Sequence, residues 1–400
     1  MEGGAVTMWV PNPVRGYTAA DMRAKTTNGA AMDVGVSKWE LDTPALCVDL
    51  DKLEQNIATM TQKLAKTGLA SRPHAKTHKT PAIARMQLDR GSIGICTAKV
   101  SEAEAMFANG IEQILMTTCN VSPSKIRRAM RIRKANRQFI QAVDNPQNAR
   151  DLSDAAQAMG LVADVVIDVA IGTRSGVPPG GQAVALAQLV DTLPNLKLRG
   201  IISYDGAVQH VKGFQTRSAQ ALKQFEASLE TYEAMKKSGL NMEIFSGGGS
   251  GTYNIMHHVP GFTDVQAGSY IFMDGQYLAI GGEDNDEIYT DFAPSLTVMT
   301  TVLNTYFPHC LTTDAGSKAL TLNQPDPIVI GEQGFTYNAG SDEFGAIRYE
   351  TSTKAYTVGD RLELIVPHCD PAVNEYDQIY ATRHDTVEAV WRVSARGHSQ

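Results

Sequence analysis

Apolar residues follow two alternating patterns from residue 45 to about residue 277. Short apolar runs, typical of buried strands, are followed by longer segments in which apolar residues recur at helical spacing. Within residues 51–67, Leu53, Ile57, Met60 and Leu64 would share one face of a helix. The predicted strands span residues 45–50, 70–75, 93–98, 113–118, 139–143, 163–169, 198–204, 242–246 and 264–267. This regular alternation predicts a parallel sheet covered by helices.

The number of strands constrains how that sheet closes. A (β/α)8 barrel needs eight parallel strands, and the pattern supplies one more. Either the first or the last strand therefore lies outside the barrel. If residues 45–50 lie outside it, residues 70–75 form the first barrel strand and residues 264–267 form the eighth.

Two of the predicted helices carry polar signals. The helix over residues 100–109 would begin with a capping box, because Glu104 follows Ser101 by three residues. The helix within residues 125–137 is rich in Lys and Arg. We interpret this basic run as the solvated outer face of a barrel helix rather than as a nucleic-acid site.

The pattern changes after about residue 277, where helical periodicity disappears. Short alternating segments, separated by Gly, Asp and Asn, predict an antiparallel β domain. Its predicted strands span residues 296–303, 328–330, 347–351, 361–366, 378–382 and 386–393. The predicted divisions are an extended N-terminal arm over residues 1–40, a lead-in strand and helix over residues 41–68, the barrel over residues 69–277 and the β domain over residues 278–400.

Composition excludes several classes of protein. The chain has 400 residues, of which 43% are hydrophobic and 20% are charged, as expected of a soluble globular protein. A net charge of −7 argues against a general affinity for nucleic acid. No apolar run is long enough to span a membrane, and the first 40 residues do not resemble a secretory signal. The five cysteines are scattered and odd in number, which favours a cytoplasmic protein without disulfides.

The candidate reactive residue is Lys76, in the segment 71–80. Arg72, His74, His78 and Lys79 surround it at the end of the first barrel strand. Nearby positive charges would lower the pKa of a lysine, and a neutral amine forms a Schiff base with a carbonyl. The alternative is an ordinary solvated basic loop.

Two later segments are candidates for binding an anion. A cluster of glycines and hydroxyls follows the seventh barrel strand, and a second short one follows the eighth, where phosphate sites of such barrels commonly lie. Backbone N–H groups can approach an anion closely where side chains are absent. A tight turn is the alternative interpretation. The residues are Gly248, Gly249, Ser250, Gly268, Ser269 and Tyr270.

Other polar side chains follow predicted strands at the same end of the barrel. Arg174 follows the fifth strand, where it would contact either a ligand or a carboxylate, and Tyr204 and His210 follow the sixth. In the β domain, an extended backbone would point His368 and Asp370 to one face and form half of a divalent metal site. A polar turn before Pro371 is the alternative there.

Six motifs occur in an order that resembles one family. The chain is similar to the D-threonine aldolase and D-serine dehydratase-like family, which are pyridoxal-phosphate enzymes of the alanine racemase fold. The resemblance implies an eight-stranded TIM-like barrel with a C-terminal antiparallel β domain, which the first strand joins, and a homodimer with its sites near the interface. The motifs lie at residues 42–46, 72–79, 99–104, 246–249, 268–270 and 368–371.

The resemblance also implies roles for the candidate residues. Lys76 would be the Schiff-base lysine, Arg174 would face the pyridine nitrogen, and Tyr204 would lie against the cofactor. His368 and Asp370 would hold a divalent metal. His210, or a water on that metal, would act as the general base. Gly248, Gly249, Ser250, Gly268, Ser269 and Tyr270 would lie near the cofactor phosphate.

One position separates activities within the family. Its dehydratases resemble each other in a His-x-Cys pair at the metal, whereas its aldolases carry His-x-Asp, as in His368 and Asp370 here. A carboxylate favours Mn²⁺ or Mg²⁺. The resemblance therefore predicts an aldolase that cleaves D-β-hydroxy-α-amino acids to glycine and an aldehyde.

The substrate and three rival activities stay open. The C-terminal segment 393–396 resembles 3-hydroxy-D-aspartate aldolases, which favours that substrate over D-threonine. Arg392 and Arg396 are spare cations that would pair with its second carboxylate, unless they are surface residues. A D-serine or 3-hydroxyaspartate dehydratase is the main alternative, followed by an amino-acid racemase and a pyridoxal-phosphate carrier.

Overall fold

The computed structural model describes residues 33–400, and most of the predicted arm at residues 1–40 lies outside them. The end of that segment belongs to the β domain. The short helix η3 (Lys38–Glu40) lies beside it, Ser37 bridges Thr386, and Lys38 pairs with Glu363 at 2.9 Å. Residues 33–40 therefore pack on their own chain.

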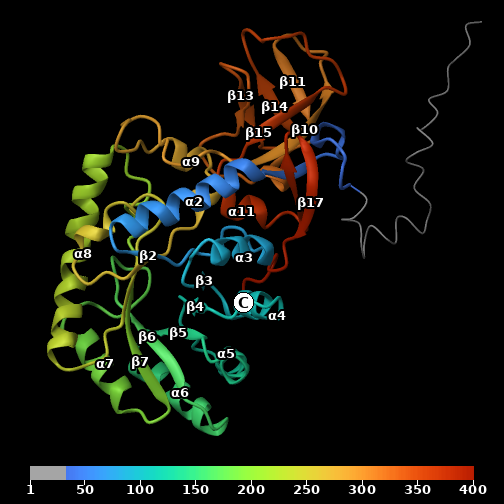
Figure 1. Cartoon of the computed structure of the whole chain (residues 1–400). Helices are drawn as coiled ribbons and strands as arrows, with labels where there is room; N and C mark the ends of the chain where they lie inside the picture. The colour runs from blue at the N-terminus through green and yellow to red at the C-terminus, as the bar shows by residue number, and fades with distance from the viewer. Residues whose placement is uncertain (1–32) are drawn as a thin grey trace, which may run out of the picture.

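Eight parallel strands form the barrel in the lower half of Figure 1. Neighbouring strands follow chain order except at the closure, where β9 pairs with β2. A parallel bridge between His74 and Cys96 joins the two ends of the sheet. The barrel strands are β2 (Ala70–Ser71), β3 (Ile95–Thr97), β4 (Ile114–Met116), β5 (Ile140–Val143), β6 (Ala163–Asp168), β7 (Leu196–Ser203), β8 (Ile244–Gly247) and β9 (Asp264–Val265).

Helices cover the outside of the barrel, and apolar side chains fill its interior. Ser122 and Asn145 cap the helices that follow β4 and β5, and a proline stands at the start of each, where it costs no hydrogen bond. The helices are α2 (Leu50–Lys66), α3 (Pro81–Asp89), α4 (Val100–Ala108), α5 (Pro123–Ala135), α6 (Pro146–Ala158), α7 (Gly181–Thr192) and α8 (Phe214–Lys237). The interior layer consists of Cys96, Leu115, Ile140, Ala142, Val166, Ile202 and Ile244.

The predicted capping box of α4 is wrong. Lys99 is the N-cap, and its side chain makes no capping hydrogen bond. Glu104 instead pairs with Arg128 at 2.5 Å. Ser101 binds the end of the chain, since its N–H and hydroxyl both donate to the carbonyl of Gln400, at 3.1 and 2.7 Å. Figure 1 shows the C-terminus returning to the barrel beside α4.

The second sheet forms the β domain. It is antiparallel except where β1 runs parallel to β16, and β1 also pairs with β10. The first strand of the described chain therefore lies in the sheet of the C-terminal half, and α2 connects it to the barrel. The strands are β1 (Ala45–Asp49), β10 (Leu296–Asn304), β11 (Cys310–Thr313), β12 (Ile328–Val329), β13 (Thr336–Asn338), β14 (Gly345–Arg348), β15 (Arg361–Ile365), β16 (Gln378–Arg383) and β17 (Thr386–Arg392).

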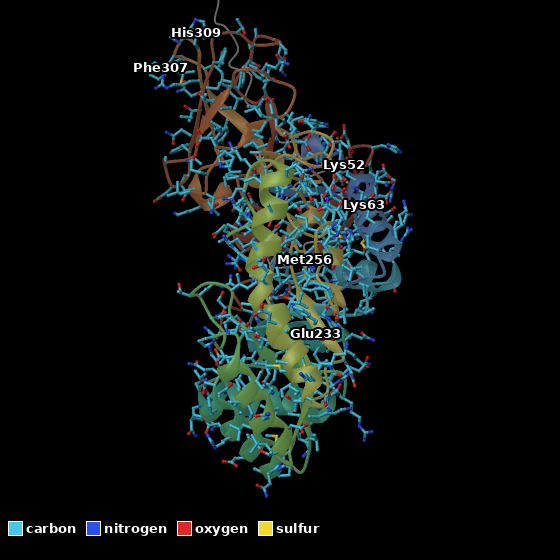
Figure 2. All side chains as sticks on the ribbon, turned by 90° about the vertical axis from the view of Figure 1, so that its left-hand side faces the viewer. Lys52, Lys63, Glu233, Met256, Phe307 and His309 are labelled. Carbon is cyan, nitrogen blue, oxygen red and sulfur yellow. The ribbon has the colours of Figure 1, made fainter. Side chains whose placement is uncertain are left out.

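Short helical turns lie between and beside the two sheets. They are η4 (Met256–His258), η5 (Ser269–Ile271), α9 (Gly275–Leu278), α10 (Ser317–Leu320) and α11 (Cys369–Val373). The view of Figure 2 shows the β domain and the barrel stacked along one axis, with Phe307 and His309 at the end farthest from the barrel. Functional side chains from both domains must therefore meet where the two sheets adjoin.

Candidate active site

A cavity of about 390 Å³ opens at the carboxyl ends of the barrel strands. It gathers side chains that are far apart in the sequence, among them Lys76, Arg174 and Tyr204. The predicted glycine loop and His210 do not line it. His74, Thr117 and Asp168 line it as well. Sequence reasoning treated His74 only as a neighbouring charge and assigned Thr117 and Asp168 no role.

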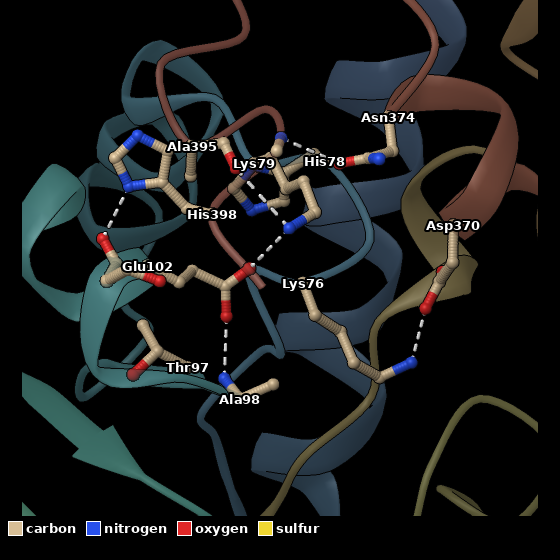
Figure 3. Close-up of polar contacts among 12 residues, drawn as sticks. Lys76, His78, Lys79, Thr97, Ala98, Glu102, Asp370, Asn374, Ala395 and His398 are labelled. Atoms are coloured by element: carbon tan, nitrogen blue, oxygen red, sulfur yellow. Dashed lines mark hydrogen bonds and ion pairs between the residues drawn. The ribbon is translucent and has the colours of Figure 1, made fainter. Parts of the chain in front are cut away.

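The electrostatic prediction for Lys76 is wrong. Burial opposes its charge, but the carboxylate of Asp370 contacts its Nζ and raises its pKa above the ordinary value. Figure 3 shows the two side chains reaching each other across the domain junction. Because the partner comes from residues near the chain end, no local pattern in the segment 71–80 revealed it.

The cations near Lys76 have partners or no charge. Arg72 pairs with Asp264 at 2.8 Å, and Lys79 pairs with Glu102 at 3.4 Å. Burial lowers the pKa of His74 far below its usual range and that of His78 to about 4, so both imidazoles are neutral. The segment therefore presents one ammonium group to the cavity, paired with Asp370, rather than a cluster of charges.

Arg174 and Tyr204 form one wall of the cavity. The guanidinium of Arg174 lies 4.8 Å from the centre of the Tyr204 ring, which holds both side chains in a stacked cation–π contact. Burial raises the pKa of Tyr204, so its hydroxyl stays protonated. Burial also raises the pKa of Asp168, beside them, to about 6.

The segment 268–270 lies against the residues next to Lys76, and the glycine loop contacts that segment. A side-chain carbon on Gly268 would stand 2.4 Å from the Thr77 hydroxyl, so only glycine permits this approach. The Tyr270 N–H donates to Ser250 Oγ at 2.9 Å and connects the two segments. Gly248 has a positive φ of 61°, a conformation that glycine adopts without strain.

The Thr77 hydroxyl supports an anion site beside these segments. It is buried and makes no hydrogen bond of good geometry within residues 33–400, although it lies close enough to Asp370 to help lower the pKa of that carboxyl. The hydroxyl of Tyr270, by contrast, accepts from Gln87 at 3.0 Å, and its N–H already donates to Ser250 Oγ.

The predicted extended geometry at His368 and Asp370 is wrong in part. His368 is extended, but α11 begins at Cys369 and places Asp370 in its first turn. Burial opposes ionisation of Asp370, but the charges of Lys76 and His368 lower its pKa well below the usual range. Asp370 is therefore a carboxylate close to both Lys76 and His368.

His210 lies beside the same turn. Its ring centre is 4.6 Å from that of Tyr277 and 6.5 Å from that of His368. Burial lowers its pKa, so the imidazole is neutral and can accept a proton. Sequence reasoning selected His210 only because it follows a barrel strand, and it missed Tyr277.

Asp274 is a further residue that sequence reasoning missed. Its carboxylate is fully buried and lies 2.8 Å from Nδ1 of His368. Possible ligand atoms of Asp274, His368 and Cys369 all lie within 4.8 Å of one another. A carboxylate between two short turns has no periodic signal that the sequence alone would reveal.

The two C-terminal arginines do not reach the cavity. Arg396 pairs with Asp377 at 3.1 Å, and Arg392 is exposed at the end of β17. Neither lines the cavity around Lys76. The proposed pairing of these cations with a substrate carboxylate therefore has no support in the geometry of this chain.

Comparison with known proteins gives a consistent relationship. Residues 48–276 match the family model "Alanine racemase, N-terminal domain", and residues 295–382 match a serine dehydratase domain. The 3-hydroxy-D-aspartate aldolase of Paracoccus denitrificans is 36% identical over 91% of this chain and 94% of its own length. The D-threonine aldolase of an Arthrobacter species is 35% identical over 90% of this chain and 94% of its own length.

Solved structures agree with these sequence matches. The crystal structure of D-threonine aldolase from Filomicrobium marinum superposes with a TM-score of 0.87 at 33% identity, covering 92% of this chain and 98% of that one. The D-threo-3-hydroxyaspartate dehydratase of Delftia sp. HT23 has a TM-score of 0.78 at 24% identity, over 89% and 98% of the two chains, and shares the fold. Within residues 33–400, no helix has both the length and the apolar character needed to cross a bilayer.

Proposed function

We infer the reaction of this chain from one premise: it belongs to the alanine racemase-like family of pyridoxal-phosphate enzymes, as a carbon–carbon lyase. We propose that it is a metal-dependent aldolase, which cleaves the Cα–Cβ bond of D-configured β-hydroxy-α-amino acids to glycine and an aldehyde. The observation that carries the proposal is the contact between Asp370 and the Nζ of Lys76. A carboxylate, rather than a thiolate, lies at the amine that would react, and a carboxylate suits Mn²⁺ or Mg²⁺ as a ligand.

The residues around the cavity fit pyridoxal phosphate. Lys76 offers the only lysine amine that lines the cavity among the described residues. The buried Thr77 hydroxyl and the closely packed glycines Gly248, Gly249 and Gly268 fit its phosphate, with Ser250 and Ser269 beside them. When bound, the cofactor supplies an electron sink for charge that develops at Cα.

The remaining cavity residues would orient the ring. Arg174 would face the pyridine nitrogen, where its positive charge disfavours protonation of that atom. Tyr204 would lie against the cofactor, in the position that its contact with Arg174 fixes. A weaker electron sink makes assistance at the β-oxygen of the substrate more important.

That assistance would come from the turn at His368. His368 and Asp370 would hold Mn²⁺ or Mg²⁺, which would orient the β-hydroxyl and lower its pKa. His210 is neutral and lies beside His368, so it is placed to accept the hydroxyl proton. The neighbouring Cys369 is a poor ligand because burial raises its thiol pKa far above the usual range.

Product analysis tests the reaction. Protein with added cofactor and Mn²⁺ is incubated with D-threonine or 3-hydroxy-D-aspartate, with L-threonine as the stereochemical control. Glycine should form in equal amount with acetaldehyde or glyoxylate, and we favour glyoxylate from the resemblance of residues 393–396 and the relative in P. denitrificans.

A dehydratase is the second candidate, because residues 295–382 match a serine dehydratase domain. Ammonia and an α-keto acid as the main products would establish it and refute the aldolase. We also expect a homodimer in the cytoplasm, which light scattering after size-exclusion chromatography and cell fractionation would test.

A further inference from the structure

The buried carboxylate of Asp274 stands between the barrel and the candidate metal ligands. It follows η5 and is the N-cap of α9, where its Oδ1 accepts the N–H of Tyr277 at 3.0 Å. Its Oδ2 accepts the N–H of Cys369 at 2.8 Å and lies 2.8 Å from Nδ1 of His368. Both oxygens accept backbone N–H groups, so the hydrogen in the third contact comes from His368 Nδ1.

This hydrogen fixes the tautomer of His368 in the neutral form, which is the form that can bind a metal. A neutral imidazole carries one hydrogen, and the nitrogen without it is the one that accepts or ligates. With Nδ1 donating to Asp274, the lone pair of His368 lies on Nε2. A carboxylate behind a ligating histidine also fixes the orientation of the ring and strengthens it as a ligand.

The backbone around Asp274 reinforces this arrangement. The N–H of Gly275 donates to the carbonyl of Val366 at 3.0 Å, and that of Gln276 donates to Pro367 at 3.1 Å. A side-chain carbon on Gly275 would lie 3.0 Å from Pro325, so there is little room for another residue. The start of α9 therefore holds the turn at residues 366–369 through backbone and side chain together.

The same carboxylate also acts on the candidate base. By capping α9, Asp274 fixes the first turn that carries Tyr277, and the Tyr277 ring packs against His210. One buried group thus holds the imidazole that would bind the metal and the aromatic ring that supports the base. Within residues 33–400, no other carboxylate hydrogen-bonds to His368.

We propose that Asp274 is a positioning residue, which presents Nε2 of His368 to a divalent cation and acts on that cation only through His368. The inference rests on the metal site of the proposed function. A direct role as ligand would require Asp274 to release the hydrogen bonds that occupy both of its oxygens.

The test measures metal affinity rather than activity. The full chain, freed of metal by chelation, is titrated with Mn²⁺, and the electron paramagnetic resonance signal of free Mn²⁺ gives the dissociation constant. Asp274→Asn should bind Mn²⁺ about 10- to 100-fold more weakly than the unmodified chain. The absorbance of added pyridoxal phosphate at Lys76 should not change, which shows that the barrel is intact.

Asp314→Asn is the matched control. Asp314 also accepts several hydrogen bonds, from Thr43, Thr300 and the N–H of Thr301, but it lies among the strands of the β domain. Its replacement should leave Mn²⁺ affinity unchanged. If Asp274→Asn does not fold, Asp274→Ser retains a cap for Tyr277 but is too short to reach His368 as well, and it should give the same loss.

Two outcomes would overturn the inference. Unchanged Mn²⁺ affinity in Asp274→Asn, or an equal loss in Asp314→Asn, would show that the hydrogen bonds of Asp274 only support the fold. In a His368→Ala background, Asp274→Asn should cost no further affinity, and an additional tenfold loss would make Asp274 a direct ligand. If the unmodified chain binds no Mn²⁺, the metal part of the proposed function fails first, so the two failures are distinguishable.

Discussion

Lys76 and Lys79 lie in one segment and both pair with carboxylates, but the pairs differ in where the carboxylate comes from (Figure 3). Lys76 lines the cavity and meets Asp370 from the other domain. Lys79 turns away from it, at a positive φ of 51°, and is enclosed with Glu102 of α4. The first pair leaves an amine at a cavity, whereas the second is sealed within the protein.

The enclosed pair also holds the end of the chain. The N–H of Ala395 donates to the carbonyl of Lys79 at 3.0 Å, and Lys79 Nζ lies 3.4 Å from the carbonyl of Ala395. Glu102 accepts the N–H of Ala98 at 2.6 Å. Two lysines with similar neighbours in sequence thus have different roles, because an amine can react only where it reaches a cavity.

The largest expected effect follows from removing the amine at the cavity. Lys76→Ala should lower activity by about 10³-fold or more, because the covalent attachment of the cofactor is lost. Borohydride reduction and peptide mapping of the unmodified chain should label Lys76. A label on Lys79 or on Lys318 would contradict the assignment.

Removing the metal tests the proposed role of Asp370, the partner of Lys76, as a metal ligand. Exhaustive chelation should abolish turnover. The absorbance of the cofactor at Lys76 should persist, because the proposed metal ligands belong to α11 and its N-cap and not to the segments that would hold the cofactor phosphate. Adding Mn²⁺ should restore turnover. Full activity in a chelated sample, with no metal by elemental analysis, would remove the metal from the mechanism.

Breaking the enclosed pair should affect stability rather than chemistry. Lys79→Met leaves the Glu102 carboxylate, which is 1% exposed, without its partner, and should lower the free energy of unfolding by about 3–5 kcal/mol in urea. Lys79→Met with Glu102→Gln should recover much of that loss. If Lys79→Met instead loses the cofactor at unchanged stability, the contrast between the two lysines is wrong.

The pH dependence of that variant has a definite sign. Burial raises the pKa of Glu102, although Lys79 opposes the rise. A carboxyl whose pKa is raised by folding stabilises the folded state most when protonated, and stability falls as pH rises from its unfolded to its folded pKa. The deficit of Lys79→Met should therefore shrink between neutral pH and about pH 4.5, the range above the ordinary Glu pKa. A deficit that grows on acidification would contradict this.

The smallest effect concerns the attachment of the chain end. Ser101 makes four contacts with the last residues. Its N–H and hydroxyl both donate to the carbonyl of Gln400, its Oγ accepts the N–H of Gln400 at 3.2 Å, and its own carbonyl accepts from His398 Nδ1 at 2.8 Å. Ser101→Ala removes only the hydroxyl contacts and should cost about 0.5–1.5 kcal/mol of stability. Turnover should be unchanged, and a large loss of activity would show that the chain end also positions Lys76.

The site was predictable where chemistry follows short patterns. The alternating apolar runs identify the barrel strands, and the position of Lys76, Arg174 and Tyr204 after those strands predicts that they share one end of the barrel. The structure brings these three to one cavity. Their roles toward the cofactor, and those of His368 and Asp370 toward a metal, remain predictions.

By itself the sequence determined which segments of the barrel form strands and helices, that a β domain follows the barrel, and which residues make up the six motifs. These features depend on backbone geometry over a few neighbouring residues. Only the tertiary structure decided that the pKa of Lys76 is raised, that Asp370 lies in a helical turn, and that Asp274 holds His368. Each of these three features depends on burial and on partners that are far apart in the chain. Burial and such contacts arise only when the two sheets pack together.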